Sequence, residues 1–532
     1  KMKLAGEAGS LLKIEEEIQE AVAEANKMWV QGLLPTKQAE LSSDLQQIRS
    51  QHRPRIAKRE VVHKEFWDLA EGLIIDALKE YAEHAENGQG ISRRLFAEDA
   101  ARGFAFIDLC RKRFDVVLMN PPFGEISTNS LLYLSSYEGH SNNISCPFVF
   151  RATDISKDSG LVGFIIDKTV AIKSSYSDFR DIITNKKFKL FLFADLGWNV
   201  LDGAQVETAL MVLSPREYPA SIFLKADSEK KSLHDLCTEE LIKNLGHFAF
   251  VRRLEDFSSI PNQSFSYDLA EDLWALFHLN SSLEPNAGIA RQGLGISDSW
   301  RWFRLRNEVL PDKIANAYYP LANGGGFSPF FRNLDLLIYW ENDGRDIKVV
   351  EGDLYGSWSR TVKNVSHYFK RGISFPKRTD FLNAHILPDN CIFSQEGLCF
   401  FSQEKKTSEW FLVGLFNSRL YQYLINSYCG QHKSVGYIKK LPFVPTRDKV
   451  QEFIEIIEHL SIEAFNIKRS FSTICTNSVF FIAPASITYM NMNTNIASKE
   501  NVQQIGLGDT ISIINSQKKK LDDNLNDIQK EI

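Results

Sequence analysis

The sequence predicts an α/β protein in which a doubly wound sheet domain is joined to a mixed α+β domain and to helical segments at both ends. Three observations lead to this prediction. Short apolar runs that are typical of strands alternate with helical patterns between residues 95 and 220. Gly-rich and aromatic stretches alternate with short strand patterns in residues 311–448. Apolar residues recur at helical spacing in residues 10–90 and again after residue 449.

Composition sets broad limits on the class of protein. The chain has 532 residues, too many for one ordinary domain, and its 44% apolar and 24% charged residues are typical of a folded soluble protein. It contains no run of 18 apolar residues, so we expect no membrane span. The seven cysteines show no metal-binding spacing, so we expect no metal site and a reduced, cytoplasmic setting.

The stretch most informative about function is Phe-Asp-Val-Val-Leu-Met-Asn-Pro-Pro-Phe, residues 114–123. Its apolar centre predicts a buried strand that ends on Asn120. Pro121 and Pro122 then fix two φ angles and remove two backbone donors, and Phe123 adds an aromatic face. The pattern therefore predicts a rigid turn that presents a polar amide and a ring at the end of a strand.

Such a turn suits chemistry on an exocyclic amine. The side-chain carbonyl of Asn120 and a backbone carbonyl beside Pro121 are two acceptors, which match the two N–H donors of an NH₂ group. Accepting both hydrogens would localise the nitrogen lone pair and direct it at a methyl donor, with no covalent intermediate. Phe123 could stack on a base flipped out of a duplex. The alternative is an ordinary Pro-Pro turn after a strand.

The motif resembles the catalytic motif of methyltransferases that modify the N6 amine of adenine in DNA. The resemblance implies an incomplete Rossmann-like methyltransferase domain, double-stranded DNA as the partner and S-adenosyl-L-methionine as the cofactor. It also implies a role for Asp99, which ends the stretch Leu95–Asp99 and would accept a hydrogen bond from the adenine amino group of the cofactor. A loop acid or a helix N-cap is the alternative for Asp99.

Downstream segments extend the resemblance. Residues 160–167 and 188–195 read as further core strands, and residues 203–213 are similar to the late motif of the family. The family often places an aromatic five residues before the valine of this motif, to pack on the flipped base. Leu201 occupies that position here, with Trp198 nearby, and a structural role for Trp198 is the alternative.

The Gly-rich cofactor loop of such enzymes is not found in this sequence. The one candidate, residues 4–10, has too few residues before it to form a strand, and Ser10 looks like the N-cap of the next helix. We therefore expect a fragment or a split subunit, with an upstream polypeptide supplying the loop.

These patterns divide the chain into five predicted parts. They are a helical insert at 1–94, the catalytic methyltransferase half-domain at 95–220, a connector at 221–310, a target recognition domain at 311–448 and a helical tail at 449–532.

The predicted target recognition domain resembles the specificity domains of type IIG restriction-modification methylases and of the BREX phage-defence methyltransferase. It contains a Gly-rich aromatic loop at 324–331, a strand at 334–340, a turn at 341–344 and an amphipathic helix at 410–424. Residues 301–448 carry 20 Lys and Arg against 14 Asp and Glu, whereas the remainder carries 42 against 53. A basic segment in an acidic chain is typical of phosphate contact, and a mixed solvated surface is the alternative.

Four cations between aromatic residues are the candidates for DNA contact. Lys370, Arg371, Lys377 and Arg378 would reach phosphates or base edges. Solvated surface charges are the alternative.

Two other functions compete with DNA adenine methylation in a restriction or phage-defence system. A DNA-recognition subunit without methyl transfer would explain the missing cofactor loop. A nuclease is suggested more faintly by Asp389 with Glu404 and Lys406, since short patterns of two carboxylates and a lysine are common.

Overall fold

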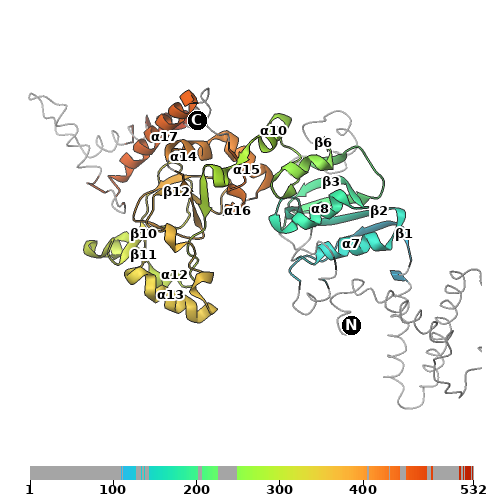
Figure 1. Cartoon of the computed structure of the whole chain (residues 1–532), viewed down its shortest axis with the longest axis horizontal. Coiled ribbons are helices and arrows are strands. Elements are labelled where there is room, and N and C mark those ends of the chain that lie inside the picture. The colour runs from blue at the N-terminus through green and yellow to red at the C-terminus, as the bar shows by residue number, and fades with distance from the viewer. Residues whose placement is uncertain are drawn as a thin grey trace, which may run out of the picture. The chain divides into compact units, whose positions relative to one another are not determined.

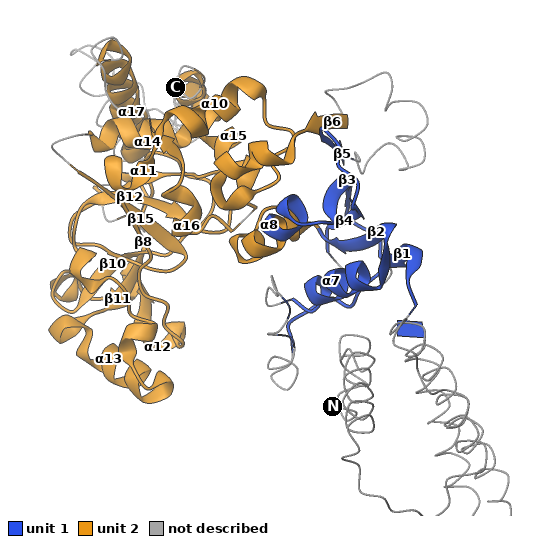
Figure 2. Cartoon of the chain, turned by 45° about the vertical axis from the view of Figure 1, so that its right-hand side comes forward, with its two compact units in different colours: residues 1–167, 181–233 blue, residues 168–180, 234–532 orange. Residues whose placement is uncertain are grey.

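The computed structural model describes residues 109–110, 112–126, 143–201, 206–225, 249–403, 407–430, 432–443 and 451–475, with single positions and short pieces at 134, at 137 and between 478 and 530. The chain forms two compact units (Figure 2), of which unit 1 comprises residues 1–167 and 181–233 and unit 2 comprises residues 168–180 and 234–532. The predicted helical insert at 1–94 lies outside the described residues.

Unit 1 is built on a mixed sheet, of which Figure 1 labels β1, β2 and β3. Its strands lie in the order β1-β2-β4-β3-β5. β1 runs parallel to β2, and β3 runs parallel to β5, whereas β4 is antiparallel to both β2 and β3. This arrangement confirms the predicted α/β class. The strands are β1 (Phe114–Met119), β2 (Ser156–Asp167), β3 (Lys189–Gly197), β4 (Thr208–Ser214) and β5 (Ser221–Lys225).

The core of this sheet comes from the continuous apolar runs of its central strands. Val162, Phe164 and Ile166 of β2 are buried, as are Met211 and Leu213 of β4. α7 (Ser145–Ile155) packs against β2, and α8 (Ser177–Asn185) follows β2 in the chain. The strands predicted at 160–167 and 188–195 are thus confirmed.

The prediction that residues 114–119 form a buried strand is wrong in one respect. The strand forms, but Val116 is 54% exposed and Leu118 is 79% exposed. The reason is its place in the sheet, because β1 is the edge strand and β2 is its one partner among the described strands. An apolar run in the sequence indicates that a strand tends to be buried. It does not indicate which elements will lie beside that strand in the folded chain.

Residues 168–180 belong to unit 2, whereas the residues before and after them in the sequence belong to unit 1, and we call this segment the excursion. α8 therefore begins in unit 2 and ends in unit 1. Arg180, at the end of this excursion, is fully buried within unit 2. Its guanidinium donates hydrogen bonds to four backbone carbonyls, those of Val170, Lys173, Asn262 and Gln263. These bonds fix the excursion to the segment around residue 262.

Unit 2 contains two four-stranded sheets, with the strand orders β14-β10-β11-β9 and β13-β12-β15-β8, and a small pair, β16 with β7. The strands of the first sheet are β9 (Phe303–Leu305), β10 (Tyr318–Ala322), β11 (Leu336–Tyr339) and β14 (Ile392–Phe393). Those of the second are β8 (Gly288–Arg291), β12 (Gly372–Pro376), β13 (His385–Leu387) and β15 (Gly397–Ser402). The other strands of unit 2 are β6 (Ala249–Arg252), β7 (Ser281–Ser282) and β16 (Pro442–Phe443).

Helices accompany these sheets along the chain. They are α10 (Glu271–Leu279), α11 (Leu283–Asn286), α12 (Ser299–Trp302), α13 (Glu341–Tyr355), α14 (Glu409–Asn417), α15 (Arg419–Tyr428), α16 (Val435–Ile438) and α17 (Gln451–Ser472). α17 confirms helix in the predicted tail. Among the described helices, none has both the length and the apolar character needed to cross a membrane.

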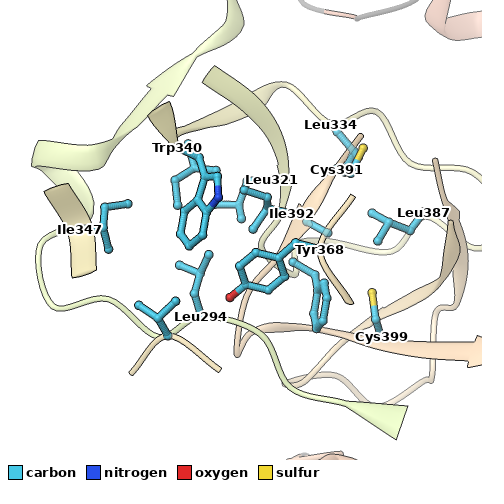
Figure 3. Packing of buried hydrophobic residues seen from close by; sticks show 14 of the residues in the cluster. Leu294, Leu321, Leu334, Trp340, Ile347, Tyr368, Leu387, Cys391, Ile392 and Cys399 are labelled. Carbon is cyan, nitrogen blue, oxygen red and sulfur yellow. The ribbon is translucent and has the colours of Figure 1, made fainter. Parts of the chain in front are cut away.

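A buried apolar cluster joins the sheets of unit 2. Figure 3 shows Trp340 and Tyr368 close together within it, and their rings meet edge to face at 5.2 Å. Ile347 contributes from α13, Ile392 from β14 and Cys399 from β15. Aromatic rings bury large areas, so this cluster is a major source of the stability of unit 2.

Two local predictions in unit 2 differ from the structure. The turn at 341–344 exists, with positive φ at Asn342, Asp343 and Gly344, but it forms the first residues of α13 itself. The helix predicted at 410–424 is two helices, because Ser418 ends α14 and its side chain caps the N-terminus of α15. The apolar spacing continues across this break and hides it.

The predicted division into domains stays a prediction. The structure adds that β8 and β9, from the predicted connector 221–310, pair with β15 and β11, from the predicted recognition domain. Strands from both parts therefore share the two sheets of unit 2.

Candidate functional site

The candidate site of unit 1 lies at the carboxyl ends of its parallel strands. β1 and β2 are paired in register, with Met119 opposite Phe164, and β3 runs in the same direction. Their ends therefore meet at one edge of the sheet, where ligands bind in open α/β sheets. Asn120 follows β1 at this edge, Asp167 ends β2, and Trp198 follows β3.

Asn120 and the residues after it form the turn that the sequence predicted. Asn120 is exposed, Pro121 is buried, Pro122 is exposed and Phe123 is half-buried. Within the described residues, the Asn120 side chain and the Pro121 carbonyl have no hydrogen-bond partner. Pro121 thus anchors the turn, and both acceptors remain available to a ligand.

Gly124 closes this turn and ties it to α7. Its φ of +125° is a conformation that side chains rarely adopt. The Gly124 carbonyl accepts a hydrogen bond from the Ile144 amide at 3.1 Å, and Glu125 forms a bridge with Asn143. Asn143 Oδ1 in turn accepts from the amide and hydroxyl of Ser145, at 3.0 and 2.9 Å, where α7 begins. The motif is therefore held from both sides, by β1 and by the start of α7.

The end of β3 brings a carboxylate and an indole to the same edge. Asp195 is buried, and its Oδ1 accepts a hydrogen bond from the Gly197 amide at 3.2 Å. Trp198 is 52% exposed, so its ring has a free face, whereas Leu201 is half-buried. An exposed indole at this edge can stack on a flat ligand, a role for which the sequence left a structural alternative open.

The residues expected to hold the cofactor cannot be placed in this site. Asp99 lies outside the described residues. The described residues instead supply the turn that would orient the substrate.

Three of the four basic residues expected to contact DNA pair with carboxylates of unit 2. Arg371 Nε donates to Glu409 Oε2 at 2.6 Å. Glu396 receives both Lys377, at 3.8 Å, and Arg378, at 3.3 Å. Lys370 is exposed and has no carboxylate partner in the part of the chain that the structure describes. The contact of these four residues with DNA stays a prediction. Lys370 could reach DNA without first breaking an ion pair within the described residues.

A second group of basic residues was not found by sequence reasoning. Burial, and then the charge of Arg332, lower the pKa of Lys468 to about 8. Burial also lowers the pKa of Arg332. The fully buried His385 has its pKa lowered to about 3, first by burial and then by Arg332 and Lys468. These residues come from distant segments, so no local pattern could have revealed the group.

The faint nuclease pattern is only partly described. Asp389 Oδ1 accepts a hydrogen bond from the Arg371 amide at 3.2 Å. Glu404 and Lys406 lie outside the described residues. The described geometry thus gives Asp389 a backbone contact and brings it no second carboxylate.

Comparison with protein families places the motif in context. Residues 39–195 match the family described as the Eco57I restriction-modification methylase, and this range includes β1 and the Asn120–Phe123 turn. The adenine-specific methyltransferase BrxX of Escherichia coli O9:H4 (strain HS) is 23% identical over 378 residues. The adenine-specific methyltransferase PglX of Lacticaseibacillus casei (strain Zhang) is 20% identical over 372 residues.

These relatives are much longer than the chain. Each alignment covers 65% of this chain but only 29% of BrxX and 30% of PglX. Among solved structures, the type IIL restriction-modification enzyme MmeI in complex with DNA matches with a TM-score of 0.47 and 11% identity, over 78% of this chain and 57% of that chain. The resemblance predicted from the Asn-Pro-Pro-Phe motif is confirmed: the chain is similar to adenine-specific methyltransferases of the restriction-modification kind.

Proposed function

We propose that this chain is the catalytic and DNA-reading part of a sequence-specific DNA adenine-N6 methyltransferase. It would act on double-stranded DNA in the cytoplasm, as part of a restriction-modification or phage-defence system. The observation that carries the proposal is the Asn120 amide, exposed and unpaired within the described residues at the carboxyl end of β1 and followed by Pro121, Pro122 and Phe123.

The turn would act by positioning and electrostatics. Asn120 Oδ1 and the Pro121 carbonyl accept the two hydrogens of the adenine amine, so the nitrogen lone pair points away from both oxygens. Phe123 stacks on the base after the base leaves the duplex. The cofactor S-adenosyl-L-methionine supplies the methyl group. Asn120 Oδ1 and the Pro121 carbonyl would hold the amine in place while it gains the methyl group and releases one proton to solvent.

The cofactor would need further residues beyond the described turn. Asp99 is the proposed acceptor for the adenine amino group of the cofactor. An upstream polypeptide is the proposed source of the Gly-rich loop. The exposure of Val116 and Leu118 on edge strand β1 supports this, because an apolar sheet edge is a template for another strand.

DNA contact is proposed for Lys370, Arg371, Lys377 and Arg378. Their position in the basic segment 301–448 supports it. Three of them would have to leave a carboxylate to reach a phosphate, so Lys370 is the first to test.

Transfer of a labelled methyl group to DNA tests the proposal. The full chain is assayed alone and together with the polypeptide encoded upstream. Asn120→Ala should abolish transfer while DNA binding remains, because the amide orients the amine and does not hold the duplex. Phe123→Ala should lower transfer, and Phe123→Trp should retain most of it, since an indole also stacks. Wild-type transfer by Asn120→Ala would contradict the assigned role.

A DNA-recognition subunit without methyl transfer is the second candidate. The absence of a recognisable Gly-rich loop in the sequence favours it. It predicts DNA binding with no transfer even when the upstream polypeptide is present, whereas the first proposal predicts transfer in that mixture.

A further inference from the structure

Two cations of unit 2 lie near each other without a carboxylate partner. Neither Arg332 nor Lys468 forms an ion pair within the described residues. Both are partly buried, and each lowers the pKa of the buried His385. Among the described residues, the charge of Asp335 acts on Arg332 and that of Asp522 acts on Lys468. Two like charges held together with partial loss of solvent are costly, and an anion between them would lower that cost.

A Gly-rich loop lies beside these cations. Arg332 Nη2 donates to the Gly326 carbonyl, and Lys468 Nζ lies 5.9 Å from the ring centroid of Phe327. Gly325 has a φ of +119°, and a Cβ there would collide with the Arg332 guanidinium. The positive φ favours glycine at this position, where the loop backbone lies close to the Arg332 side chain.

The loop is held rigidly, but its amides are free. Asn383 Nδ2 donates to the Gly326 carbonyl at 2.8 Å, and Asn383 Oδ1 accepts from the Ser328 amide at 2.6 Å. By contrast, the backbone N–H groups of residues 324–327 donate to no acceptor in the described part of the chain. Successive free amides in a turn are donors that an anion can use where they converge.

Two buried polar atoms of His385 and Arg332 have no hydrogen-bond partner among the described residues. His385 is 1% exposed, and its Nε2 has no hydrogen-bond partner. Arg332 Nε is also buried without a partner. The chain brings the two residues together, because Phe330, two residues before Arg332, bridges to His385. Buried polar atoms without partners are rare in folded proteins, and one of these two belongs to Arg332, which contacts the Gly326 carbonyl of the loop.

We propose that the Gly324–Phe327 loop, Arg332 and Lys468 together bind a backbone phosphate of the DNA. This inference rests on the proposed function, which makes DNA the partner. Phosphate is the anion that suits the site, since it offers several acceptor oxygens to amide and cationic donors at once. The exposed rings of Phe327 and Phe381, paired at 5.8 Å, flank the site and give the sugar an apolar surface.

The loop also joins the site to the cations that the sequence singled out. The ideal Cβ of Gly324 would lie 2.8 Å from the backbone carbonyl of Glu396. The Glu396 carboxylate is already shared by Lys377 and Arg378, so its negative charge is largely compensated. The phosphate site therefore adjoins a cluster in which two cations share one carboxylate, so the cluster keeps a net positive charge.

The dependence of DNA binding on salt tests the proposal. The affinity of the full chain for a short random-sequence duplex is measured by fluorescence anisotropy at several salt concentrations. Each phosphate contact adds about 0.9 to the slope of log affinity against log salt. Lys468→Gln should therefore lower the slope by about 0.9, and Lys468→Arg should restore it. Lys468 is a better probe than Arg332, because Arg332 also holds the loop through Gly326.

Lys348 provides a matched control. It too is a partly buried lysine near aromatic rings, at 5.4 Å from Trp340 and 5.1 Å from Trp358, but it pairs with Asp343 at 2.7 Å. Lys348→Gln should leave the slope unchanged, and thermal melts should show that all variants are folded. A wild-type slope in folded Lys468→Gln would overturn the phosphate site alone. No binding of DNA by the wild-type chain would overturn the proposed function as well.

Discussion

Arg371 donates from Nε to Glu409 Oε2 at 2.6 Å, and its guanidinium carbon lies 5.4 Å from the ring centroid of Trp410. The pair joins the start of β12 to the first turn of α14. Glu409 is only 15% exposed, so its charge is less screened than that of a fully solvated residue. A residue predicted to read DNA is therefore also part of the internal packing of unit 2.

The first prediction concerns this ion pair. Arg371→Gln and Glu409→Gln should each lower the free energy of unfolding, with a coupling of about 0.5–1 kcal/mol between them. Urea unfolding of both single variants and the double variant measures the coupling. Lys370→Gln should weaken DNA binding with no such coupling, because Lys370 has no carboxylate partner in the described part of the chain. Strictly additive effects at 371 and 409 would contradict the pair.

The second prediction concerns the turn after the catalytic motif. Gly124→Ala should lower methyl transfer at least about tenfold, because strain at a φ of +125° displaces the oxygens that orient the amine. Open space surrounds this position, so the effect comes from the backbone and not from a clash. Gly356→Ala is the control, since Gly356 has a φ of +74° and equally open surroundings at the end of α13. It should cost stability and leave transfer per folded molecule unchanged.

The third prediction concerns the pH dependence of stability. The pKa of Lys468 is about 8 in the folded state and 10.5 ordinarily, so between these values the unfolded chain binds more protons. The free energy of unfolding should therefore gain about 1–2 kcal/mol from this group as the pH rises from 8 to 10.5. Below pH 8 the lysine is charged in both states, and its penalty is fully present. Lys468→Met should flatten this rise in urea unfolding measured across the range, and an unchanged pH profile would contradict the lowered pKa.

The fourth prediction concerns β1, which is the edge strand of its sheet among the described strands. Leu118→Lys should reduce self-association of the isolated chain in light scattering, because a charge on an apolar edge strand opposes strand addition. It should also weaken association with the upstream polypeptide. Leu354→Lys on α13 is the control, since Leu354 is 60% exposed but belongs to a helix. Equal effects of the two substitutions would point to general hydrophobicity and away from the edge.

The fifth prediction concerns the break between α14 and α15. Ser418 Oγ accepts from the Tyr421 amide at 3.3 Å, so Ser418→Ala should lower the free energy of unfolding by about 1 kcal/mol. Ser418→Asp should retain most of that stability in the same denaturant titration, because a carboxylate also caps a helix. A loss of equal size in both variants would show that the hydroxyl acts elsewhere, through its bond to the Leu415 carbonyl at 2.7 Å.

The sequence predicted those parts of the fold that depend on neighbours along the chain. β2 and β3 follow from continuous apolar runs, and the Asn120–Phe123 turn follows from two consecutive prolines. The exposure of Leu118 did not follow, because burial of a strand depends on which elements flank it in space. The break at Ser418 did not follow either, since apolar residues keep helical spacing on both sides of it.

The same distinction explains the two groups of basic residues. Lys370 and its neighbours were found because cations and aromatic residues alternate there in the sequence. Arg332 and Lys468 lie on a loop and on α17, so only the folded chain brings them together. Conversely, no sequence pattern indicated that Glu396 takes up both Lys377 and Arg378.

The excursion of residues 168–180 into unit 2 limits how the two units can be exchanged between related proteins. A gene fusion with a single junction between residues 233 and 234 would separate Arg180 from Asn262 and Gln263, whose carbonyls it binds. A hybrid that grafts a new unit 2 onto this unit 1 must therefore carry residues 168–180 with the graft. Natural recombination that swaps one unit for another faces the same requirement for three junctions, one on each side of that segment and one between residues 233 and 234.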